Sequence, residues 1–202
     1  MKKQCPLCKS QKINFELDDY IKNQYWKCSN CKLLFQNPIT EYSYNESYWT
    51  NAIDPDGNEK DQTIMKDFKI KNWYGDISKF VKKLKPGKIF DVGCGLGFLL
   101  SDISKTWEKY GSDASKFAIS FIEDNYNEII IKELDLEKPP PENLRNFDVV
   151  VCYHVIEHIE NPDLFFKHLS MMVKKKGVLI VGTPNIGSFG AKRFKGNFRL
   201  LG

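Results

Sequence analysis

Apolar and polar positions follow two different rhythms along residues 88–184. Short, nearly continuous apolar runs are typical of strands that are buried on both faces of a parallel sheet. The longer segments between them carry apolar side chains every three or four residues, which is typical of helices. This alternation predicts a doubly wound, mostly parallel α/β sheet. The strands are expected at 88–92, 109–113, 128–135, 147–155 and 178–184, and the helices at 97–107, 115–126 and 161–177.

A helical rhythm also precedes the sheet, over residues 63–84. Apolar side chains recur there at helical spacing, and a Lys-Pro-Gly sequence follows them. One or two amphipathic helices are therefore expected, and the proline should end the last of them. The apolar positions are Ile64, Phe68, Trp73, Ile77, Phe80, Val81 and Leu84.

The segment before these helices, residues 41–62, is polar and aromatic and contains the turn sequence Asp-Pro-Asp-Gly. A linker or a flexible cover is expected here. The aromatic side chains Tyr42, Tyr44, Tyr48 and Trp49 have two interpretations. They could form a lid that excludes water from a ligand site. Alternatively, they could pack between an N-terminal module and the main domain.

Four cysteines near the N-terminus form two Cys-x-x-Cys pairs. Cys5 and Cys8 make the first pair, Cys28 and Cys31 make the second, and 19 residues separate them. This spacing is typical of a four-cysteine zinc site. Four thiolates leave no coordination position open, so the zinc would be structural rather than catalytic.

A module of this size buries little apolar surface, and a metal would supply the missing folding energy. Short strands are expected between the cysteine pairs, at 12–17 and 24–28. The alternatives are two unrelated pairs or a redox motif, but redox motifs usually occur singly, beside a βαβ pattern. Cys94 and Cys152 lie in apolar runs and are expected to be small buried hydrophobes rather than metal ligands.

These patterns divide the 202 residues into three parts. Residues 1–40 form a zinc-ribbon-like module, 41–86 an aromatic linker with helices, and 87–202 the main domain. No run reaches the ~20 apolar residues that span a bilayer, and the N-terminus lacks the apolar part of a signal peptide. A cytoplasmic location is expected, where cysteines stay reduced. The net charge of +4 is too small to predict a nucleic-acid partner.

The turn after the first expected strand of the sheet has glycines at alternate positions, in the sequence Asp91-x-Gly93-x-Gly95-x-Gly97. A strand, a glycine-rich turn and a helix together are typical of a nucleotide site. The spacing does not fit the dinucleotide fingerprint Gly-x-Gly-x-x-Gly, which argues against a dehydrogenase-like enzyme. It resembles the first motif of the class I S-adenosylmethionine-dependent methyltransferases, a Rossmann-like family. The resemblance covers residues 88–185.

This resemblance implies which residues contact S-adenosylmethionine. Asp91 would hold the amino end of the methionine part, directly or through water. Asp113 would bind the ribose hydroxyls, and Asp135 would lie near the adenine amine. From the residues alone, Asp113 could instead be only a helix cap and Asp135 only a turn residue. The expected cofactor contacts are Asp91, Gly93, Cys94, Gly95, Gly97, Asp113, Ala114, Asp135, Leu136 and Tyr153.

His154, Glu157 and His158 follow the fourth expected strand, and this region also resembles the same family. Methyl transfer mainly requires alignment, and a base is needed only for an acceptor that loses a proton. We predict His158 as that catalytic base. In one alternative, His154 and His158 bind a metal for a catechol-like acceptor. In the other, which we favour for His154 and Glu157, these side chains only shape the pocket.

The family core ends in an antiparallel hairpin, but residues 186–202 contain no pair of strand-like runs. We therefore expect a sheet without this hairpin, either because the chain is a fragment or because a partner chain completes the sheet. The expected acceptor is a small molecule such as a sugar, a nucleotide-sugar or another metabolite. A ribosomal RNA methyltransferase with a zinc module and a non-catalytic binding module are the alternatives.

Overall fold

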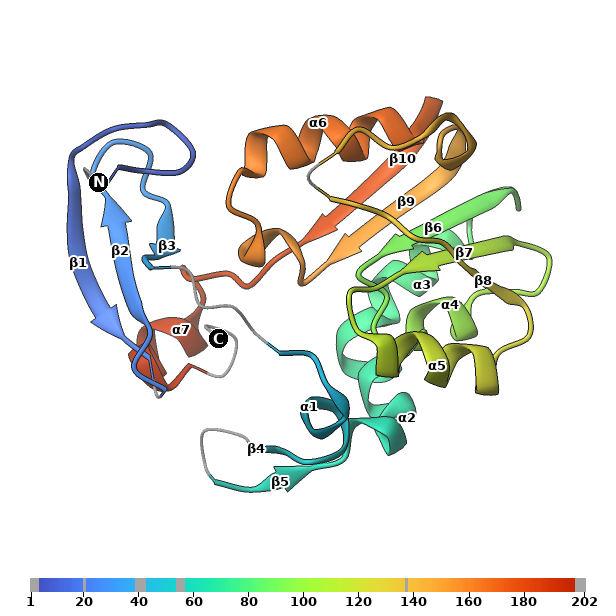
Figure 1. Ribbon diagram of the computed structural model, residues 1–202, viewed down its shortest axis with the longest axis horizontal. Coiled ribbons are helices and arrows are strands. Elements are labelled where there is room, and N and C mark those ends of the chain that lie inside the picture. The colour runs from blue at the N-terminus through green and yellow to red at the C-terminus, as the bar shows by residue number, and fades with distance from the viewer. Residues whose placement is uncertain (1–3, 20, 39–42, 54–56, 137, 199–202) are drawn as a thin grey trace.

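The computed structural model describes residues 4–19, 21–38, 43–53, 57–136 and 138–198 (Figure 1). Its centre is a five-stranded sheet in the order β10-β9-β6-β7-β8, and all neighbouring strands are parallel. This sheet confirms the predicted α/β class. Its strands are β6 (Lys88–Val92), β7 (Glu108–Ser112), β8 (Ile129–Ile131), β9 (Phe147–Tyr153) and β10 (Val173–Gly182).

Helices cover both faces of the sheet because the central strands are apolar on both sides. Ile89 and Val149 face a core formed with α3 (Gly75–Val81), α4 (Phe98–Asp102) and α5 (Lys116–Asn125). The neighbouring residues Phe90 and Val150 face the opposite core, formed with α6 (Pro162–Met172). Adjacent residues of one strand thus enter different cores, as the alternation of side chains along a strand requires. Cys94 and Cys152 are buried, one in each core, as predicted.

The last helix of the sheet ends earlier than predicted. Residues 161–177 were expected to be helical, but α6 ends at Met172 and β10 begins at Val173. Val173 pairs with Phe147 of β9, and the register shifts before Val178. The lysine-rich stretch therefore lies on an exposed edge strand, where charged side chains are favourable. Helical periodicity could not reveal this, because solvated lysines suit a helix end equally well.

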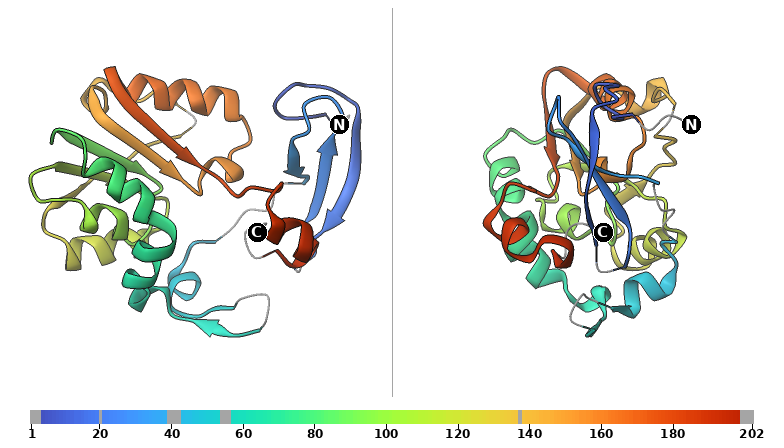
Figure 2. Two further views of the ribbon diagram at one scale, coloured as in Figure 1. Left: turned by 180° about the vertical axis from the view of Figure 1, so that it is seen from behind. Right: turned by 90° about the vertical axis from the view of Figure 1, so that its left-hand side faces the viewer.

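A second, antiparallel sheet lies beside the first (Figures 1 and 2). It contains β1 (Ile13–Asp18), β2 (Gln24–Cys28) and β3 (Leu34–Gln36), and we call residues 4–38 the ribbon. The chain returns to the ribbon after β10, through α7 (Phe189–Phe194) and the 3-10 helix η5 (Lys195–Asn197). Gly196 lies directly against the carbonyl oxygen of Asp18, where a Cβ atom would come within 2.1 Å. The described residues after β10 include these helices and no further strand.

The segment between the two sheets is mostly helical. A continuous helix covers residues 66–81, made of α2 (Lys66–Lys69), a π-helical segment η2 (Ile70–Tyr74) and α3. Before it lie short elements: α1 (Glu46–Thr50), β4 (Ala52–Ile53), β5 (Glu59–Lys60) and the 3-10 helix η1 (Gln62–Ile64). The described helices include none that is long and apolar enough to cross a membrane.

Candidate functional site

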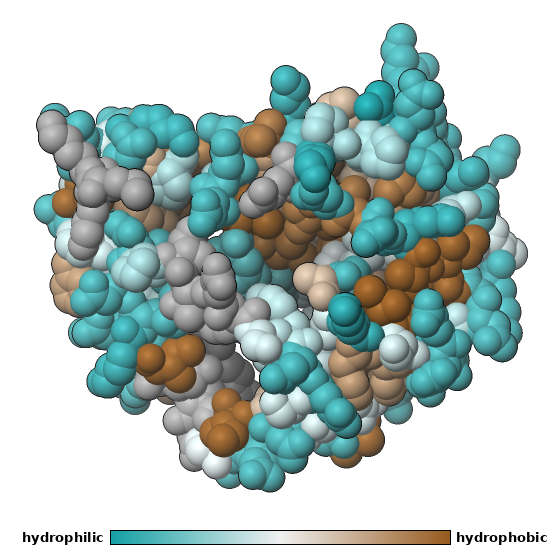
Figure 3. All heavy atoms as spheres, in the orientation of Figure 1, coloured by the Kyte–Doolittle hydropathy of each residue, from teal (hydrophilic) through white to brown (hydrophobic). Residues whose placement is uncertain are grey.

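A cavity of about 500 Å³ lies at the carboxyl edge of the five-stranded sheet. The carboxyl ends of β9 and β10 point toward the ribbon (Figure 1), and the surface between ribbon and sheet is hollowed, with apolar side chains on the sheet side (Figure 3). The wall comes from α1, the helix 66–81 and the turns after β6, β7 and β9. Of the residues predicted from the sequence, Gly93, Gly95, Asp113, Ala114, Asp135, Leu136, Tyr153 and His158 line it.

The glycine turn after β6 forms the floor of this cavity. Gly93, Gly95 and Gly97 all have positive φ, at 69°, 53° and 74°, a region that L side chains rarely adopt. A Cβ atom at Gly93 would lie 2.3 Å from Val155 Cγ2, so any side chain there would force the wall apart. Gly97 does not line the cavity. It packs against Ile122 of α5 and thereby seats α4 on the sheet.

Cys94 was predicted to contact the cofactor, but it is absent from the cavity wall. Its side chain is 5% exposed and packs below the turn, where a Cβ atom at Gly111 would come within 2.8 Å of its Sγ atom. Burial holds the pKa of this thiol well above its ordinary value. Cys94 can therefore contribute a backbone contact and packing, while its side chain stays a small hydrophobe.

Asp113 joins the glycine turn to the end of β7. Its carboxylate accepts hydrogen bonds from the backbone N–H of Gly95 at 2.8 Å and of Ser115 at 2.9 Å. Burial raises the pKa of Asp113 although both amide bonds favour the charged form. Because Asp113 lines the cavity and also fixes the turn, ligand binding and the shape of the floor depend on one carboxylate.

Asp91 was also predicted to contact the cofactor, but it is absent from the cavity wall. It lies in β6, just before the glycine turn, with 4% of its surface exposed. Within the described part of the chain its carboxyl group has no hydrogen-bond partner, and burial together with the charge of Asp113 raises its pKa to about 8. A buried carboxyl group without a partner is costly, and a cation beside it would relieve that cost. The ammonium group of a methionine-like ligand has the charge that this position requires.

Lys69 is a site residue that the sequence did not reveal. Its amino group lies 5.2 Å from the ring centre of Trp73, 5.9 Å from that of Trp49 and 5.8 Å from that of Phe98. Nζ donates a 2.7 Å hydrogen bond to Gln62 Oε1, and burial lowers the pKa of Lys69 to about 8. This buried cation borders the cavity and could receive a carboxylate.

Lys69 escaped prediction because the expected helix face was partly wrong. Ile64, Phe68 and Phe80 were grouped with the apolar face, yet they are 80%, 50% and 44% exposed. Ile77 and Val81 are buried as expected, together with Lys69. Lys69 precedes the π-helical segment η2, and Ile77 and Val81 follow it. The wider turn of a π-helix shifts the buried face along the chain, and simple 3.6-residue spacing does not anticipate that shift.

The aromatic residues of α1 pack on the main domain. Trp49 is buried against Leu96 and Phe98, and its Nε1 donates a 2.8 Å hydrogen bond to Ser115 Oγ. Tyr44 and Tyr48 line the cavity together with Trp49. This arrangement is that of an aromatic wall over the glycine turn. Tyr42, the fourth aromatic residue of the expected lid, lies outside the described residues.

The other end of the cavity carries the polar residues that follow β9. His154 Nδ1 lies 2.9 Å from Glu157 Oε1, and Thr183 Oγ1 donates to Glu157 Oε2 at 3.2 Å. His158, the predicted base, lies at the exposed rim with its ring 6.4 Å from that of Tyr44. Desolvation by the surrounding protein lowers the pKa of His158, so the neutral imidazole is favoured. His168 is 5% exposed and lies apart, with Nδ1 3.2 Å from the carbonyl oxygen of Leu136.

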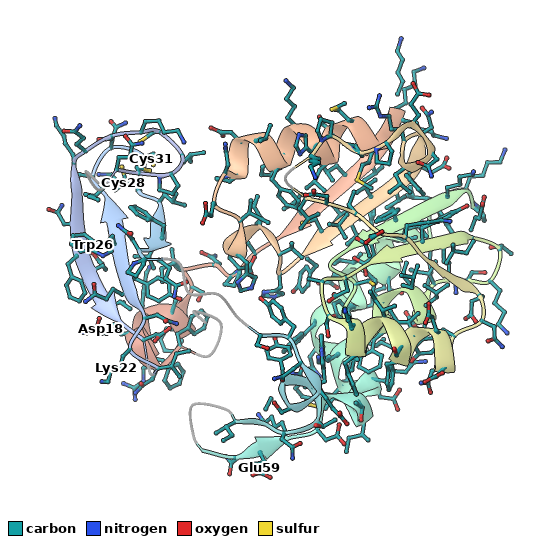
Figure 4. All side chains as sticks on the ribbon, in the orientation of Figure 1. Asp18, Lys22, Trp26, Cys28, Cys31 and Glu59 are labelled. Carbon is teal, nitrogen blue, oxygen red and sulfur yellow. The ribbon has the colours of Figure 1, made fainter. Side chains whose placement is uncertain are left out.

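The four N-terminal cysteines converge at one end of the ribbon, where Figure 4 labels Cys28 and Cys31. Their four Sγ atoms lie within 4.8 Å of one another, with Cys5 and Cys31 at 3.5 Å and Cys8 and Cys28 at 3.6 Å. Tetrahedral zinc with Zn–S bonds of about 2.3 Å separates its sulfurs by about 3.8 Å, so the spacing fits such an ion.

The two cysteine loops have the same backbone. Lys9 and Lys32 each follow a pair and have φ of 58° and 67°, and each donates its N–H to the carbonyl oxygen of the first cysteine at 3.0 Å. Two equivalent turns that aim their thiols at one point are the donor set expected for a structural metal. Among the described residues, no other group of three or more His, Cys, Asp or Glu side chains converges in this way. His154, Glu157 and His158 thus form no such group.

Comparison with known proteins relates this chain to methyltransferases. Residues 90–179 match the family model described as "Methyltransferase domain". The ubiquinone biosynthesis O-methyltransferase of Pelagibacter ubique is 33% identical over 128 residues, which cover 61% of this chain and 50% of the relative. The enzyme of the same name from Rickettsia typhi is 36% identical over 120 residues, covering 58% and 46%.

Among solved structures, a Methanococcus maripaludis protein described as an S-adenosyl-L-methionine-dependent methyltransferase aligns with a TM-score of 0.50. Its sequence is 17% identical, and the alignment covers 71% of this chain and 66% of that one. At this identity the likeness shows the fold alone. The chain spans about half the length of the two curated relatives. The family match over residues 90–179, the parallel sheet and the curated relatives together support a class I S-adenosylmethionine-dependent methyltransferase domain in this part of the chain.

Proposed function

We propose that this chain transfers a methyl group from S-adenosylmethionine to a hydroxyl group of a small molecule. The observation that carries the proposal is the cavity at the carboxyl edge of the sheet, which brings the glycine turn, the carboxyl groups of Asp113 and Asp135 and the buried Lys69 together. The names of the curated relatives, which are O-methyltransferases of ubiquinone biosynthesis, favour an oxygen acceptor in a small molecule over ribosomal RNA.

The cavity fits the charges of the cofactor. The methionine part of S-adenosylmethionine carries an ammonium and a carboxylate. The ammonium would favour the ionised form of the buried Asp91 carboxyl group, and the carboxylate would face the buried amino group of Lys69. Asp113 would bind the ribose hydroxyls, while Asp135 and Leu136 would border the adenine. When bound, the cofactor supplies a methyl group activated by its positive sulfur.

The protein's own residues would mainly align and shield the reactants. Gly93 and Gly95 leave room along the floor, and Trp49 with Tyr44 and Tyr48 forms a wall that excludes water. A sulfonium methyl group needs no further activation, so the remaining chemical task is the proton of the acceptor. His158 and His154 both reach the cavity wall, and either could take that proton.

Label transfer tests this proposal. The zinc-loaded chain is incubated with S-adenosylmethionine that carries a ¹³C methyl group, together with catechols, phenols, sugars and nucleotide-sugars. We expect S-adenosylhomocysteine to form with at least one hydroxyl acceptor, and a new O–¹³CH₃ signal to appear. Asp113→Asn serves as the control, because it removes the ribose contact. A folded wild-type chain that binds neither S-adenosylmethionine nor S-adenosylhomocysteine would overturn the proposal.

We also propose that Cys5, Cys8, Cys28 and Cys31 hold one structural zinc ion. The support is the convergence of their thiols and the hydrogen bond that Asn30 Nδ2 donates to Cys8 Sγ at 3.5 Å. Metal analysis of the purified chain should give one zinc per chain. Less than one tenth of a zinc ion, in a chain whose four thiols react freely, would contradict it.

Two further expectations stay proposals. Reduced thiolates suit a cytoplasmic location. β10 is one of the two edge strands of the described five-stranded sheet, and a strand from a partner chain would complete the hydrogen bonds of that edge.

A further inference from the structure

Three polar side chains after β9 and β10 form a connected row at the cavity. His154 Nδ1 lies 2.9 Å from Glu157 Oε1, and Thr183 Oγ1 lies 3.2 Å from Glu157 Oε2. The side chains of His154 and Glu157 are 24% and 23% exposed, so the pair is partly withdrawn from water. His154 belongs to the cavity wall, whereas Glu157 and Thr183 stand behind it.

The direction of these bonds selects the tautomer of a neutral imidazole ring. An ionised carboxylate can only accept hydrogen bonds, so Glu157 accepts from Thr183 Oγ1–H and from His154 Nδ1–H. A neutral His154 then carries its proton on Nδ1 and a lone pair on Nε2. Within the described residues Nε2 has no hydrogen-bond partner, and it is the ring nitrogen left for a ligand.

The surrounding structure holds the His154 ring in place. Its backbone has φ of 58°, a conformation that is unusual for a residue other than glycine and is often found at functional sites. Its N–H donates to the carbonyl oxygen of Gly182 at 2.9 Å. The rings of Tyr153 and Trp73 lie 4.4 Å and 6.0 Å away. Gly182 makes room for Tyr153, since a Cβ atom there would come within 2.4 Å of that ring.

A base that is oriented by a third group is the usual arrangement for proton removal, and His154 has this support. His158 also lines the cavity, and its ring lies 6.4 Å from that of Tyr44. The sequence predicted His158 as the base and treated His154 and Glu157 as pocket-shaping groups. The geometry favours the reverse order.

We propose that His154, oriented by Glu157 and Thr183, is the base that removes the proton from a hydroxyl acceptor. The O–H bond of the acceptor breaks and its proton moves to His154 Nε2. The oxygen lone pair forms the new bond to the methyl carbon, and the electron pair of the S–CH₃ bond stays on sulfur, leaving S-adenosylhomocysteine. The imidazolium, stabilised by Glu157, later releases its proton to water. This inference rests on the proposed function and identifies the acceptor group as a hydroxyl.

The first test reads the tautomer and needs no acceptor. The chain contains three histidines, so ¹⁵N-histidine spectra of wild type and His154→Gln assign the His154 signals directly. We expect the Nδ1–H tautomer in the wild type and a shift toward the Nε2–H tautomer in Glu157→Gln. An Nε2–H tautomer in the wild type would overturn the proposal, whether or not the chain is a methyltransferase.

The second test reads proton transfer directly. A nitrocatechol, whose phenolate absorbs visible light, is added to the complex with S-adenosylhomocysteine. We expect bound phenolate in the wild type and at least tenfold less in His154→Gln. No phenolate in the wild type, or equal amounts in both proteins, would contradict the role of His154. A calorimetric titration of S-adenosylhomocysteine on the same samples keeps this result separate from a failure of the proposed function.

Turnover of an accepted hydroxyl compound gives the third readout. His154→Gln should lower kcat on the order of 10²–10⁴-fold and leave cofactor affinity within about twofold. Added imidazole should restore part of the activity of His154→Ala. The decrease in kcat should be smaller in Glu157→Gln and in His158→Gln than in His154→Gln. A larger loss in His158→Gln would return the role of base to His158.

Discussion

The ribbon and the five-stranded sheet differ in what holds them together. Among the described residues 4–38, the buried apolar side chains are Cys5, Cys28 and Tyr25. The sheet, in contrast, has two cores that contain whole faces of α4, α5 and α6. The ribbon therefore depends on its cysteine group and, we propose, on a metal, whereas the sheet depends on apolar burial.

The two regions also have separate roles, ligand binding in the sheet domain and metal binding in the ribbon. The cavity is lined by residues of the segment 44–159 and by none of the described ribbon residues. The ribbon nevertheless contacts η5, which follows the sheet in the chain. Cofactor binding should therefore survive the loss of the ribbon fold, and metal binding should survive damage to the sheet.

Cys28→Ser should have the largest effect, because it removes one of four metal ligands. Structural zinc sites contribute about 10–16 kcal/mol in small modules, so loss of the ion should unfold the ribbon. Metal content, measured after gel filtration, should fall below one tenth of a zinc per chain, while the affinity for S-adenosylhomocysteine stays within about threefold. Cys152→Ala, which removes a buried cysteine of β9, should keep the metal. Full metal content in Cys28→Ser would refute the four-cysteine site.

Phe165→Ala comes next and tests the other half of the comparison. Phe165 is 1% exposed between α6 and the sheet, and such a truncation costs about 3–5 kcal/mol. We expect Tm, followed by circular dichroism, to fall by about 10 °C while zinc content stays unchanged. The neighbouring Phe166 is 43% exposed, and Phe166→Ala should change the stability by less than about 0.5 kcal/mol. Equal losses in both variants would show that α6 does not pack as described.

Gly93→Ala should weaken cofactor binding more than it weakens the fold. Its new Cβ atom would lie 2.3 Å from Val155 Cγ2 and would force the cavity wall apart. We expect S-adenosylhomocysteine affinity, measured by calorimetry, to fall about 10–100-fold. Gly57 has a similar φ of 82° with nothing within 4 Å of its Cβ position. Gly57→Ala should therefore share the backbone strain but keep the affinity for S-adenosylhomocysteine. A similar loss of affinity in Gly57→Ala would contradict the explanation by a clash with Val155.

Asp91→Asn should have the smallest and most pH-dependent effect. The folded-state pKa of Asp91, about 8, lies above its ordinary value, so the folded chain holds a proton that the unfolded chain has released. This group's contribution to stability therefore falls as pH rises from about 4 to about 8 and then levels off. Asp91→Asn should flatten that part of the Tm–pH curve, raise Tm by a few degrees at pH 8 and weaken cofactor binding. A stability curve with unchanged slope would show that Asp91 is ionised throughout.

Much of this molecule could be predicted from the sequence because its signals are local. The strands of the sheet are apolar runs, and the ribbon cysteines have a spacing that suits one metal. Asp113 could be placed at the cavity because an acid at the end of a parallel strand must lie at the carboxyl edge.

What could not be predicted depends on small changes of backbone geometry. Lys69 is buried and Phe68 is exposed just before the π-helical segment, which changes the helical phase between them and α3. The positive φ of His154 brings its ring beside Glu157, although the residues between them are not a regular α-helix. Neither feature changes the pattern of apolar and polar positions, so periodicity does not report them.

The proposed methyltransferase function depends above all on the cavity being a cofactor site. Calorimetric titration with S-adenosylhomocysteine tests this most directly. The sample is the zinc-loaded wild-type chain, with NAD as a control ligand. We predict one binding site per chain with micromolar affinity for S-adenosylhomocysteine and no heat from NAD. A folded chain that binds no S-adenosylhomocysteine, or that binds NAD instead, would contradict the account.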